Sequence, residues 1–225
     1  MGFSAAGQVL DLIAGVVSLA FPPHCLLCQT PLETVGARDA LCAGCRRALP
    51  VNARLLTAPA GLVWARAACR YDGAAKRCVL RLKYDAQLGL AAPMARRMLA
   101  AARATPRWTA DAVLPVPLHA VRARERTFNH AESLAAAVGR GLGLPVVTGA
   151  LARTRPTVPQ HRLDARRRRR NVGGAFLVRR PERLLGRRLL LVDDVVTTGA
   201  TARACAQALT AAGAAEVGLL TFAHG

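Results

Sequence analysis

The pattern of hydrophobic positions divides the chain into short apolar runs and longer segments with helical periodicity. Continuous or alternating apolar runs predict strands at 63–71, 111–117, 145–147, 175–179, 189–193 and 217–222. Apolar residues spaced three and four apart predict helices at 1–20, 74–104, 131–142 and about 200–212. Strands that alternate with helices are typical of a parallel α/β sheet with helices on both faces.

Breaks in this pattern predict where the elements end. Gly89 and Pro93 interrupt the helical pattern over 74–104, and Gly141 and Gly143 mark the end of the helix over 131–142. The stretch 149–174 is rich in arginine and has little apolar periodicity, so it predicts a loop. The run 217–222 is expected to close the sheet.

The longest apolar run, 9–21, is interrupted by Asp11 and is shorter than the 18 or so residues that a membrane helix needs. It also lacks the basic leading region of a signal peptide. We therefore expect an amphipathic helix over 1–20 and a cytoplasmic protein that does not span the membrane. The remaining chain is expected to form a small cysteine-containing unit over 21–50 and an α/β domain over 51–225.

Four of the seven cysteines form two Cys-x-x-Cys pairs, Cys25/Cys28 and Cys42/Cys45. Each pair brings two sulfurs together on a tight turn, and two pairs complete the tetrahedral four-thiolate coordination of a structural zinc ion. Redox or disulfide chemistry is the alternative interpretation. His24, beside Cys25, is a competing ligand by position, but the favoured interpretation is that it takes no part in binding. The other three cysteines, in apolar or helical surroundings, are expected to be buried as small hydrophobic residues.

The composition indicates which class of molecule the chain could bind. Hydrophobic residues make up 52% of the chain, enough for a core, and the formal net charge is +19. Such a charge attracts polyanions, either nucleic acid or phosphorylated metabolites. Thirty of the 32 basic residues are arginines, a bias that a GC-rich genome also produces.

The segment 189–202 carries the clearest chemistry. A buried strand is followed by two adjacent carboxylates, Asp193 and Asp194, and then by a Thr-Thr-Gly-Ala-Thr turn that leads into a helix. Ligands of open α/β sheets bind at the carboxyl ends of the strands. Small residues, hydroxyl groups and the N–H groups of a helix N-terminus bind phosphate, whereas ionised carboxylates accept hydrogen bonds from sugar hydroxyls. One turn therefore has the groups to hold both ends of a ribose 5-phosphate.

This segment resembles the loop of type I phosphoribosyltransferases that binds phosphoribosyl pyrophosphate. The resemblance implies that the acid pair binds the ribose hydroxyls and that the turn holds the 5-phosphate. The residues concerned are Asp193, Asp194, Val195, Val196, Thr197, Thr198, Gly199, Ala200 and Thr201. It also implies the phosphoribosyltransferase fold for the α/β domain.

Other residues extend the resemblance over nearly the whole chain. The segment 113–119 is followed by Arg122, Arg124, Arg126, Phe128 and Asn129, and later by Gln160, Leu163, Arg166, Asn171 and 174–176. Together with the four cysteines, this pattern is similar to that of the ComF family of bacterial competence proteins. The family usually has Arg-Gly-Phe-Asn-Gln where this chain has Thr127 and His130 as departures.

The resemblance implies further roles. A pyrophosphate-contacting loop is expected after the strand over 111–117, at Pro117, Leu118, His119, Arg122, Arg124 and Arg126. Mg²⁺ would accompany the pyrophosphate if the chain is catalytic. The sequence identifies no general base, and His119 and His130 are candidates by position alone, with a structural or polar-contact role favoured for each.

Residues 149–174 resemble the hood that closes over the substrate, and they contain Arg153 and the run Arg166, Arg167, Arg168, Arg169 and Arg170. A charge run is usually a solvated face. Its two functional interpretations are contact with pyrophosphate and contact with a nucleic-acid backbone. Because no aromatic residues are interleaved, contact with nucleic acid would be electrostatic and weakly specific for sequence.

Two classes of function remain open from the sequence. One is a phosphoribosyltransferase with an unknown acceptor. The other is a non-catalytic binding or adaptor protein that uses the same pocket for a phosphorylated ribose or for single-stranded DNA. The ComF resemblance implies a role in DNA uptake and transformation, with a helicase-like translocation ATPase or a DNA-loading protein as partner. A nucleotide-metabolism transferase is a third alternative, which the zinc ribbon and the absence of a base-recognition loop disfavour.

Overall fold

The computed structural model describes residues 23–32, 40–49, 54–104, 109–118, 129–154 and 175–225. The helix expected over 1–20 lies outside the described residues. So do the predicted site residues His119, Arg122, Arg124, Arg126 and the run Arg166–Arg170. Within the described residues, no helix is long and apolar enough to cross a membrane.

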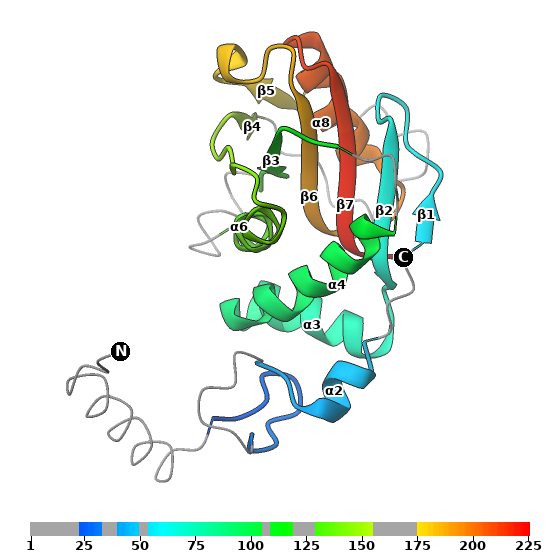
Figure 1. The fold of residues 1–225 in the computed structure, drawn as a ribbon, viewed down its shortest axis with the longest axis vertical. Coiled ribbons are helices and arrows are strands. Elements are labelled where there is room, and N and C mark those ends of the chain that lie inside the picture. The colour runs from blue at the N-terminus through cyan, green and yellow to red at the C-terminus, as the bar shows by residue number, and fades with distance from the viewer. Residues whose placement is uncertain (1–22, 33–39, 50–53, 105–108, 119–128, 155–174) are drawn as a thin grey trace, which may run out of the picture.

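A five-stranded sheet in the order β1-β2-β7-β6-β3 forms the centre of the molecule (Figure 1). Its strands are β1 (Arg54–Leu56), β2 (Trp64–Arg70), β3 (Ala112–Pro115), β6 (Arg188–Val196) and β7 (Glu216–His224). All neighbouring pairs are parallel except β1 and β2. The predicted parallel α/β sheet is confirmed, but β7 lies inside it, between β2 and β6, rather than closing one edge.

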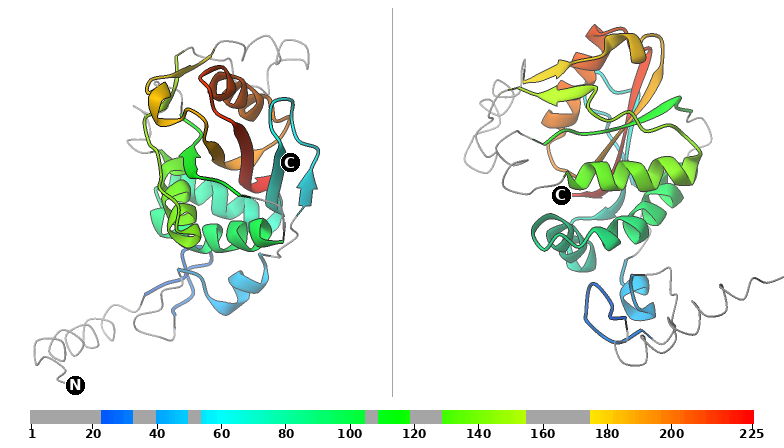
Figure 2. Two further views of the ribbon diagram at one scale, coloured as in Figure 1. Left: turned by 45° about the horizontal axis from the view of Figure 1, so that its top comes forward. Right: turned by 90° about the vertical axis from the view of Figure 1, so that its left-hand side faces the viewer.

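Helices cover both faces of the sheet, as predicted (Figure 2). One face packs against α3 (Gly73–Tyr84), α4 (Ala91–Arg103) and α6 (His130–Leu142), and the other against α8 (Ala200–Ala211). Strand β6 contributes Leu190 and Val192 to the first core and Leu189 and Leu191 to the second. Burial on both sides explains why its sequence is continuously apolar rather than alternating.

The long helical segment is interrupted earlier than its sequence predicts. Helix α3 ends at Tyr84, and Ala86 has a positive φ of 52° before the short 3₁₀ helix η1 (Leu88–Leu90). Pro93 does not break the following helix, because it occupies the first turn of α4. The N–H group that proline lacks has no intrahelical partner there, so its loss costs nothing.

Short strands and turns are the other differences. The predicted strand over 145–147 is reduced to a single bridge between Val113 and Val146. The predicted loop over 149–174 contains β4 (Leu151–Arg153), which pairs with β5 (Phe176–Val178) in a separate antiparallel ribbon. Helix α2 (Ala43–Arg47), the 3₁₀ helix η3 (Pro181–Arg183) and β1 were not predicted. These helices and strands have too few residues to show a hydrophobic periodicity. For the short strands, a partner strand elsewhere in the chain also decides whether they form.

Candidate functional site

The turn between β6 and α8 contains the Thr-Thr-Gly-Ala-Thr sequence. Strand β6 extends past the acid pair to Val196, because β7 still provides a partner there, with Val195 opposite Ala223. Thr197 and Thr198 are exposed, and α8 begins at Ala200. The first N–H groups of a helix have no intrahelical acceptor, and the helix dipole makes this end electropositive. Hydroxyls and N–H donors therefore meet at the carboxyl end of a central strand.

Gly199 is required in this turn for two reasons. Its φ of +68° lies in the left-handed region, and a Cβ atom added there would be 2.5 Å from Cγ of Pro59. The loop between β1 and β2 thus lies directly against the turn. The sequence showed no sign of the contribution of Pro59, because nothing local connects it to residue 199.

Asp194 is buried in an ion-pair cluster. Its side chain is 3% exposed, and its Oδ2 atom lies 2.6 Å from Nζ of Lys83 and 3.1 Å from Nε2 of His130. Burial by itself would raise the pKa of Asp194, but the hydrogen bond from His130 and the charge of Lys83 outweigh it and lower the pKa to about 2. Asp194 is therefore ionised and already paired within the protein.

Asp193 has a different environment although it is the adjacent residue. It is half-buried, and its Oδ1 accepts a hydrogen bond of 2.9 Å from the backbone N–H of Asp194. Burial and the negative charge of Asp194 raise its pKa to about 7. Asp193 is thus the more accessible carboxylate of the pair, and its charge responds to pH near neutrality.

Two partners of the acid pair come from distant helices. Lys83 is in the last turn of α3, and His130 is the first residue of α6, where Asn129 caps the helix by accepting from the N–H of Ala131 at 3.1 Å. Sequence reasoning missed Lys83. Its signal was rarity, because Lys76 and Lys83 are the only lysines. For His130, the favoured polar-contact role agrees with its contact with Asp194.

Of the remaining predicted site residues, the structure describes Pro117, Leu118 and Arg153. Pro117 and Leu118 are half-buried and follow β3, whose carboxyl end lies beside that of β6. The guanidinium of Arg153, on β4, lies over the ring of Phe176 at 5.6 Å.

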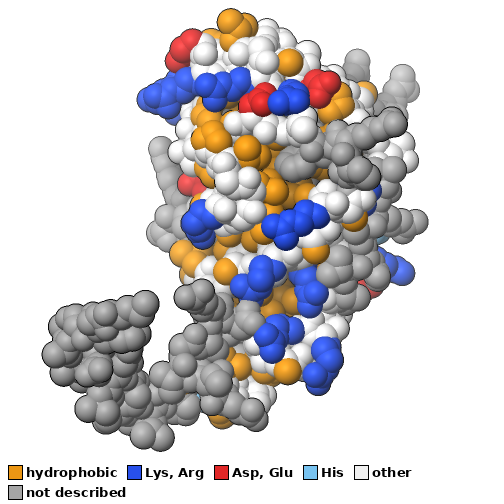
Figure 3. All heavy atoms as spheres, viewed as in Figure 1, with side chains coloured by type: hydrophobic (Ala, Val, Ile, Leu, Met, Phe, Trp, Pro, Cys, Tyr) orange, Lys and Arg blue, Asp and Glu red, His pale blue; other side chains and the backbone are white. Residues whose placement is uncertain are grey.

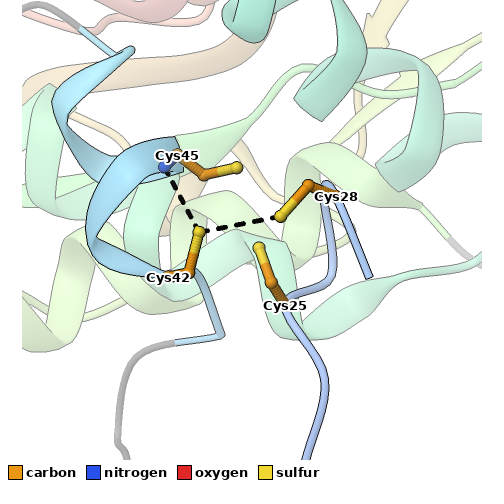
Figure 4. Close-up of side chains that lie close together, drawn as sticks. All are labelled: Cys25, Cys28, Cys42 and Cys45. Atoms are coloured by element: carbon orange, nitrogen blue, oxygen red, sulfur yellow. Dashed lines mark hydrogen bonds between the residues drawn. The ribbon is translucent and has the colours of Figure 1, made fainter. Parts of the chain in front are cut away.

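The four cysteines of the two pairs converge as predicted (Figure 4). One sulfur atom from each of them lies within 4.8 Å of the others, and Sγ of Cys28 is 3.6 Å from Sγ of Cys42. Tetrahedral coordination with Zn–S bonds of about 2.3 Å places the sulfurs about 3.8 Å apart. His24 does not belong to this cluster among the described residues.

The chemistry of these sulfurs also fits a cation. Hydrogen bonds from Thr30 lower the pKa of Cys28 to about 6, whereas burial and the neighbouring sulfurs raise the pKa of Cys45. Four thiolates at this distance repel one another unless a positive ion lies between them. The cluster therefore supports a structural zinc ion. Cys69, Cys78 and Cys205 are buried, as expected for cysteines that act as small hydrophobic residues.

A second group of possible ligands, His130, Asp193 and Asp194, does not fit a protein-held cation. These residues also place one ligand atom each within 4.8 Å of one another. However, Oδ2 of Asp194 already contacts the ammonium group of Lys83 at 2.6 Å, so one carboxylate oxygen of this group is paired within the protein. Mg²⁺ prefers several oxygen ligands in octahedral geometry, which these residues do not supply.

Two known domain families match this chain, one over the α/β domain and one over the cysteine ribbon. Residues 92–225 match the phosphoribosyl transferase domain family, and residues 16–56 match the double zinc ribbon domain family. The DNA utilization protein YhgH of Escherichia coli O157:H7 is 33% identical over 221 residues, which cover 88% of this chain and 96% of that protein.

A second relative, competence protein F of Haemophilus influenzae, is 32% identical over 144 residues, with 62% of this chain and 63% of that protein covered. Among solved structures, the glutamine phosphoribosylpyrophosphate amidotransferase from B. subtilis matches with a TM-score of 0.41 and 20% identity. That match covers 63% of this chain and 30% of the amidotransferase, so the chain spans under a third of its length.

Proposed function

This chain belongs to the ComF family of competence proteins, and we propose that it binds phosphoribosyl pyrophosphate or a related ribose phosphate and acts in DNA uptake. One observation carries the ligand proposal. The turn at 197–201 joins the carboxyl end of a central parallel strand to the N-terminus of a 12-residue helix, with two exposed threonines before it. Anions bind at such a junction in open α/β sheets.

The phosphate end of the ligand would lie in this turn. The hydroxyls of Thr197, Thr198 and Thr201 and the N–H groups that begin α8 would donate to its oxygens. A glycine at 199 allows the backbone to take the required conformation with Pro59 against it. Val195 and Val196 would place the turn through their pairing with β7.

The ribose end would meet Asp193. This carboxylate is accessible, whereas Asp194 is occupied by Lys83 and His130. We therefore assign contact with the ribose hydroxyls to Asp193 and support of that contact to Asp194. A pyrophosphate group on the same ribose would extend toward Pro117 and Leu118, which lead into the segment with His119, Arg122, Arg124 and Arg126.

If the chain is a transferase, its reaction breaks the bond between C1 of the ribose and the pyrophosphate oxygen, and an acceptor takes the C1 position. Mg²⁺ would arrive with the ligand and neutralise departing charge. The protein would orient the ribose through Asp193 and the phosphate through the turn.

The zinc ribbon is proposed to have a structural role. Its core residues Cys25, Leu27, Leu41 and Leu49 belong to the same buried cluster as α3 and α4. A metal that holds the four cysteines together would therefore also hold the ribbon on the α/β domain.

The role in DNA uptake rests on the relatives, one named as a DNA utilization protein and one as a competence protein. We propose that the chain acts at the cytoplasmic side of the membrane with a translocation ATPase or a DNA-loading protein.

The decisive experiment is calorimetric titration of the zinc-loaded protein with phosphoribosyl pyrophosphate and Mg²⁺ at moderate salt. We expect saturable binding that is lost in Asp193→Asn. Asp72→Asn is the matched control, because it removes an exposed carboxylate at the start of α3. Absence of binding by the folded, zinc-loaded wild type contradicts the ligand proposal. Transformation assays with the same variants test its biological relevance.

A second candidate function is binding of single-stranded DNA without catalysis. It is favoured by the net charge of +19 and by basic side chains that outnumber acidic ones on the face shown in Figure 3. The exposed arginines on α2 and α4 include Arg46, Arg47, Arg96 and Arg103. Replacing Arg166–Arg170 with serine should weaken DNA binding and reduce its salt dependence. Equal affinity and equal salt dependence would exclude that run as the contact.

A further inference from the structure

Lys83 has an unusual position for a basic residue of this chain. Only 22% of its side chain is exposed, and its Nζ atom lies 2.6 Å from Oδ2 of Asp194. The only other lysine, Lys76, lies two turns earlier on α3 and is exposed. The chain thus places a compact ammonium ion, rather than a planar guanidinium, against the buried member of the acid pair.

Arg81 lies on the same helical turn and contacts the cysteine ribbon. Its Nη1 atom donates to the backbone carbonyl of Leu26 at 3.0 Å. Residues two apart on a helix do not point in the same direction. The last turn of α3 therefore contacts the ribbon through one side chain and the acid pair through another.

The ribbon contact is closely packed. Leu26 lies between the first two cysteines, and its N–H donates to the carbonyl of Ala40, just before the second pair, at 2.9 Å. A Cβ atom on Gly89 would lie 2.8 Å from Cδ1 of Leu26, so η1 and the ribbon approach as closely as a glycine permits. Displacement of the cysteine loops would therefore move Leu26 away from Arg81.

Asp194 needs Lys83 as a permanent partner. His130 also contacts its Oδ2, from α6, but carries a charge only when protonated. The third charged group at this point is Asp193, whose carboxylate is repelled by that of Asp194. The positive charge of Lys83 offsets the negative charge of Asp194. Asp193 can therefore ionise beside Asp194, and its carboxylate can then accept hydrogen bonds from a ligand.

We propose that Lys83 is a positioning residue of the ligand site and that the cysteine ribbon holds it in place through Arg81. This inference rests on the proposed function, because it explains how the ribbon supports ribose-phosphate binding. The ribbon then stabilises the position of α3 beside the ribose-phosphate site. Loss of the ribbon's metal would therefore lower the affinity of that site for its ligand.

Calorimetric titration with phosphoribosyl pyrophosphate and Mg²⁺ tests the role of Lys83 in the full chain. Lys83→Met should weaken binding by about tenfold or more, which corresponds to loss of one charged contact. Lys83→Arg keeps the charge but replaces the compact ammonium with a larger guanidinium, so it should recover part of the affinity. Lys76→Met removes the same charge from the same helix and should bind as the wild type does. Unchanged binding by Lys83→Met, or an equal loss in Lys76→Met, overturns the inference.

The link to the ribbon has its own pair of variants. Arg81→Met removes the bond to Leu26, and Arg77→Met removes an exposed arginine one turn earlier. We expect about a fivefold loss of affinity in Arg81→Met, a coupling of ordinary size, and none in Arg77→Met. If zinc removal and Arg81→Met both leave the affinity unchanged, the ribbon does not support the pocket.

Hydrogen exchange without ligand separates this inference from the proposed function. Lys83→Met and Arg81→Met should both accelerate amide exchange over 193–199, whereas Lys76→Met and Arg77→Met should not. If the wild type does not bind phosphoribosyl pyrophosphate, the proposed function fails, but this measurement still tests the contact from ribbon to acid pair. Equal exchange in all five proteins overturns the inference.

Discussion

The cysteine ribbon and the acid pair of β6 are two polar clusters on either side of α3, and they are assembled in opposite ways. The ribbon takes all four sulfurs from one short segment, Cys25 to Cys45, and a cation from solution is needed to neutralise them. Asp194 instead receives Lys83 from α3 and His130 from α6, so its charge is compensated within the chain.

The difference concerns what each cluster depends on. A site whose ligands lie close together in sequence can form wherever the metal is present, but it is lost with the metal. A site built by tertiary contacts needs no external ion, but it depends on the packing of several helices. Arg81 contacts the ribbon and Lys83 contacts Asp194. The last turn of α3 therefore connects the cluster that needs a metal with the cluster that needs helix packing.

The strongest test of this comparison removes a sulfur. Cys45→Ser should lose the zinc and cost several kcal/mol of stability, because metal binding supplies the folding free energy of such a ribbon. Cys205→Ala removes a buried thiol on the opposite face and should retain the metal. Metal analysis and thermal unfolding of both variants measure the effect. Full stability of Cys45→Ser without metal would show that the ribbon does not depend on zinc.

The next test breaks the internally compensated cluster. Asp194→Asn leaves the buried His130 and the largely buried Lys83 without their carboxylate, at a cost of about 3 kcal/mol. Asp111→Asn is the control, since that carboxylate is paired with Arg188 at the surface and should matter less. Denaturant titration gives both values. Equal small losses would mean that the cluster is not important for stability.

A smaller effect is expected from the turn that holds the phosphate. Gly199→Ala introduces a Cβ atom against Pro59 at a positive φ, and should cost about 2 kcal/mol and abolish ligand binding. Gly186→Ala has a nearly identical φ of +69° but nothing within 4 Å of its Cβ, so it should cost about 1 kcal/mol. Stability curves for the pair separate backbone strain from the contact with Pro59. Identical losses would rule out the contact.

The smallest effect concerns the pH dependence of stability. The pKa of Asp193 rises from its ordinary 3.8 to about 7 in the folded protein. The folded state therefore holds a proton that the unfolded chain has lost, and stability falls as the pH rises through this window. Asp193→Asn should remove this slope and stabilise the protein at pH 7.5, with no gain at pH 4. Denaturant titrations at both pH values check it, and a gain of equal size at both would exclude titration of Asp193 as the cause.

Asp194 contributes a pH dependence of stability of the opposite sign. Its pKa is lowered to about 2, so it contributes stability above its ordinary 3.8 that is lost as the pH falls toward 2. The wild type and Asp194→Asn should therefore converge in stability in strong acid.

Much of the fold could be predicted from the sequence where periodicity was sustained. Strand β6 and helices α6 and α8 lie where their patterns placed them. The run over 217–222 was identified as a strand but not as an internal one, because strand order depends on crossovers rather than on local pattern. Strand β4 was missed since its three residues pair only with β5 across a long intervening segment.

In the candidate site too, the features set by neighbouring residues could be predicted, whereas those set by distant residues could not. The four cysteines and the Thr-Thr-Gly turn were identified because their ligands are neighbours in sequence. The unequal environments of Asp193 and Asp194 could not be identified, since the two residues are identical and adjacent. Only the helices packed on one face of β6 distinguish them.

The amino-acid sequence by itself determined which chemical groups this protein uses: four sulfurs at a spacing that suits a metal, an acid pair and a hydroxyl-rich turn after a buried strand. The tertiary structure alone decided that Asp194 is paired, that Asp193 is accessible, and that the ribbon and the acid pair meet the same turn of α3. The physical reason is that hydrogen-bond and metal-ligand spacing are local properties of the chain. Burial and charge compensation instead depend on elements that come together only when the sheet and its helices pack.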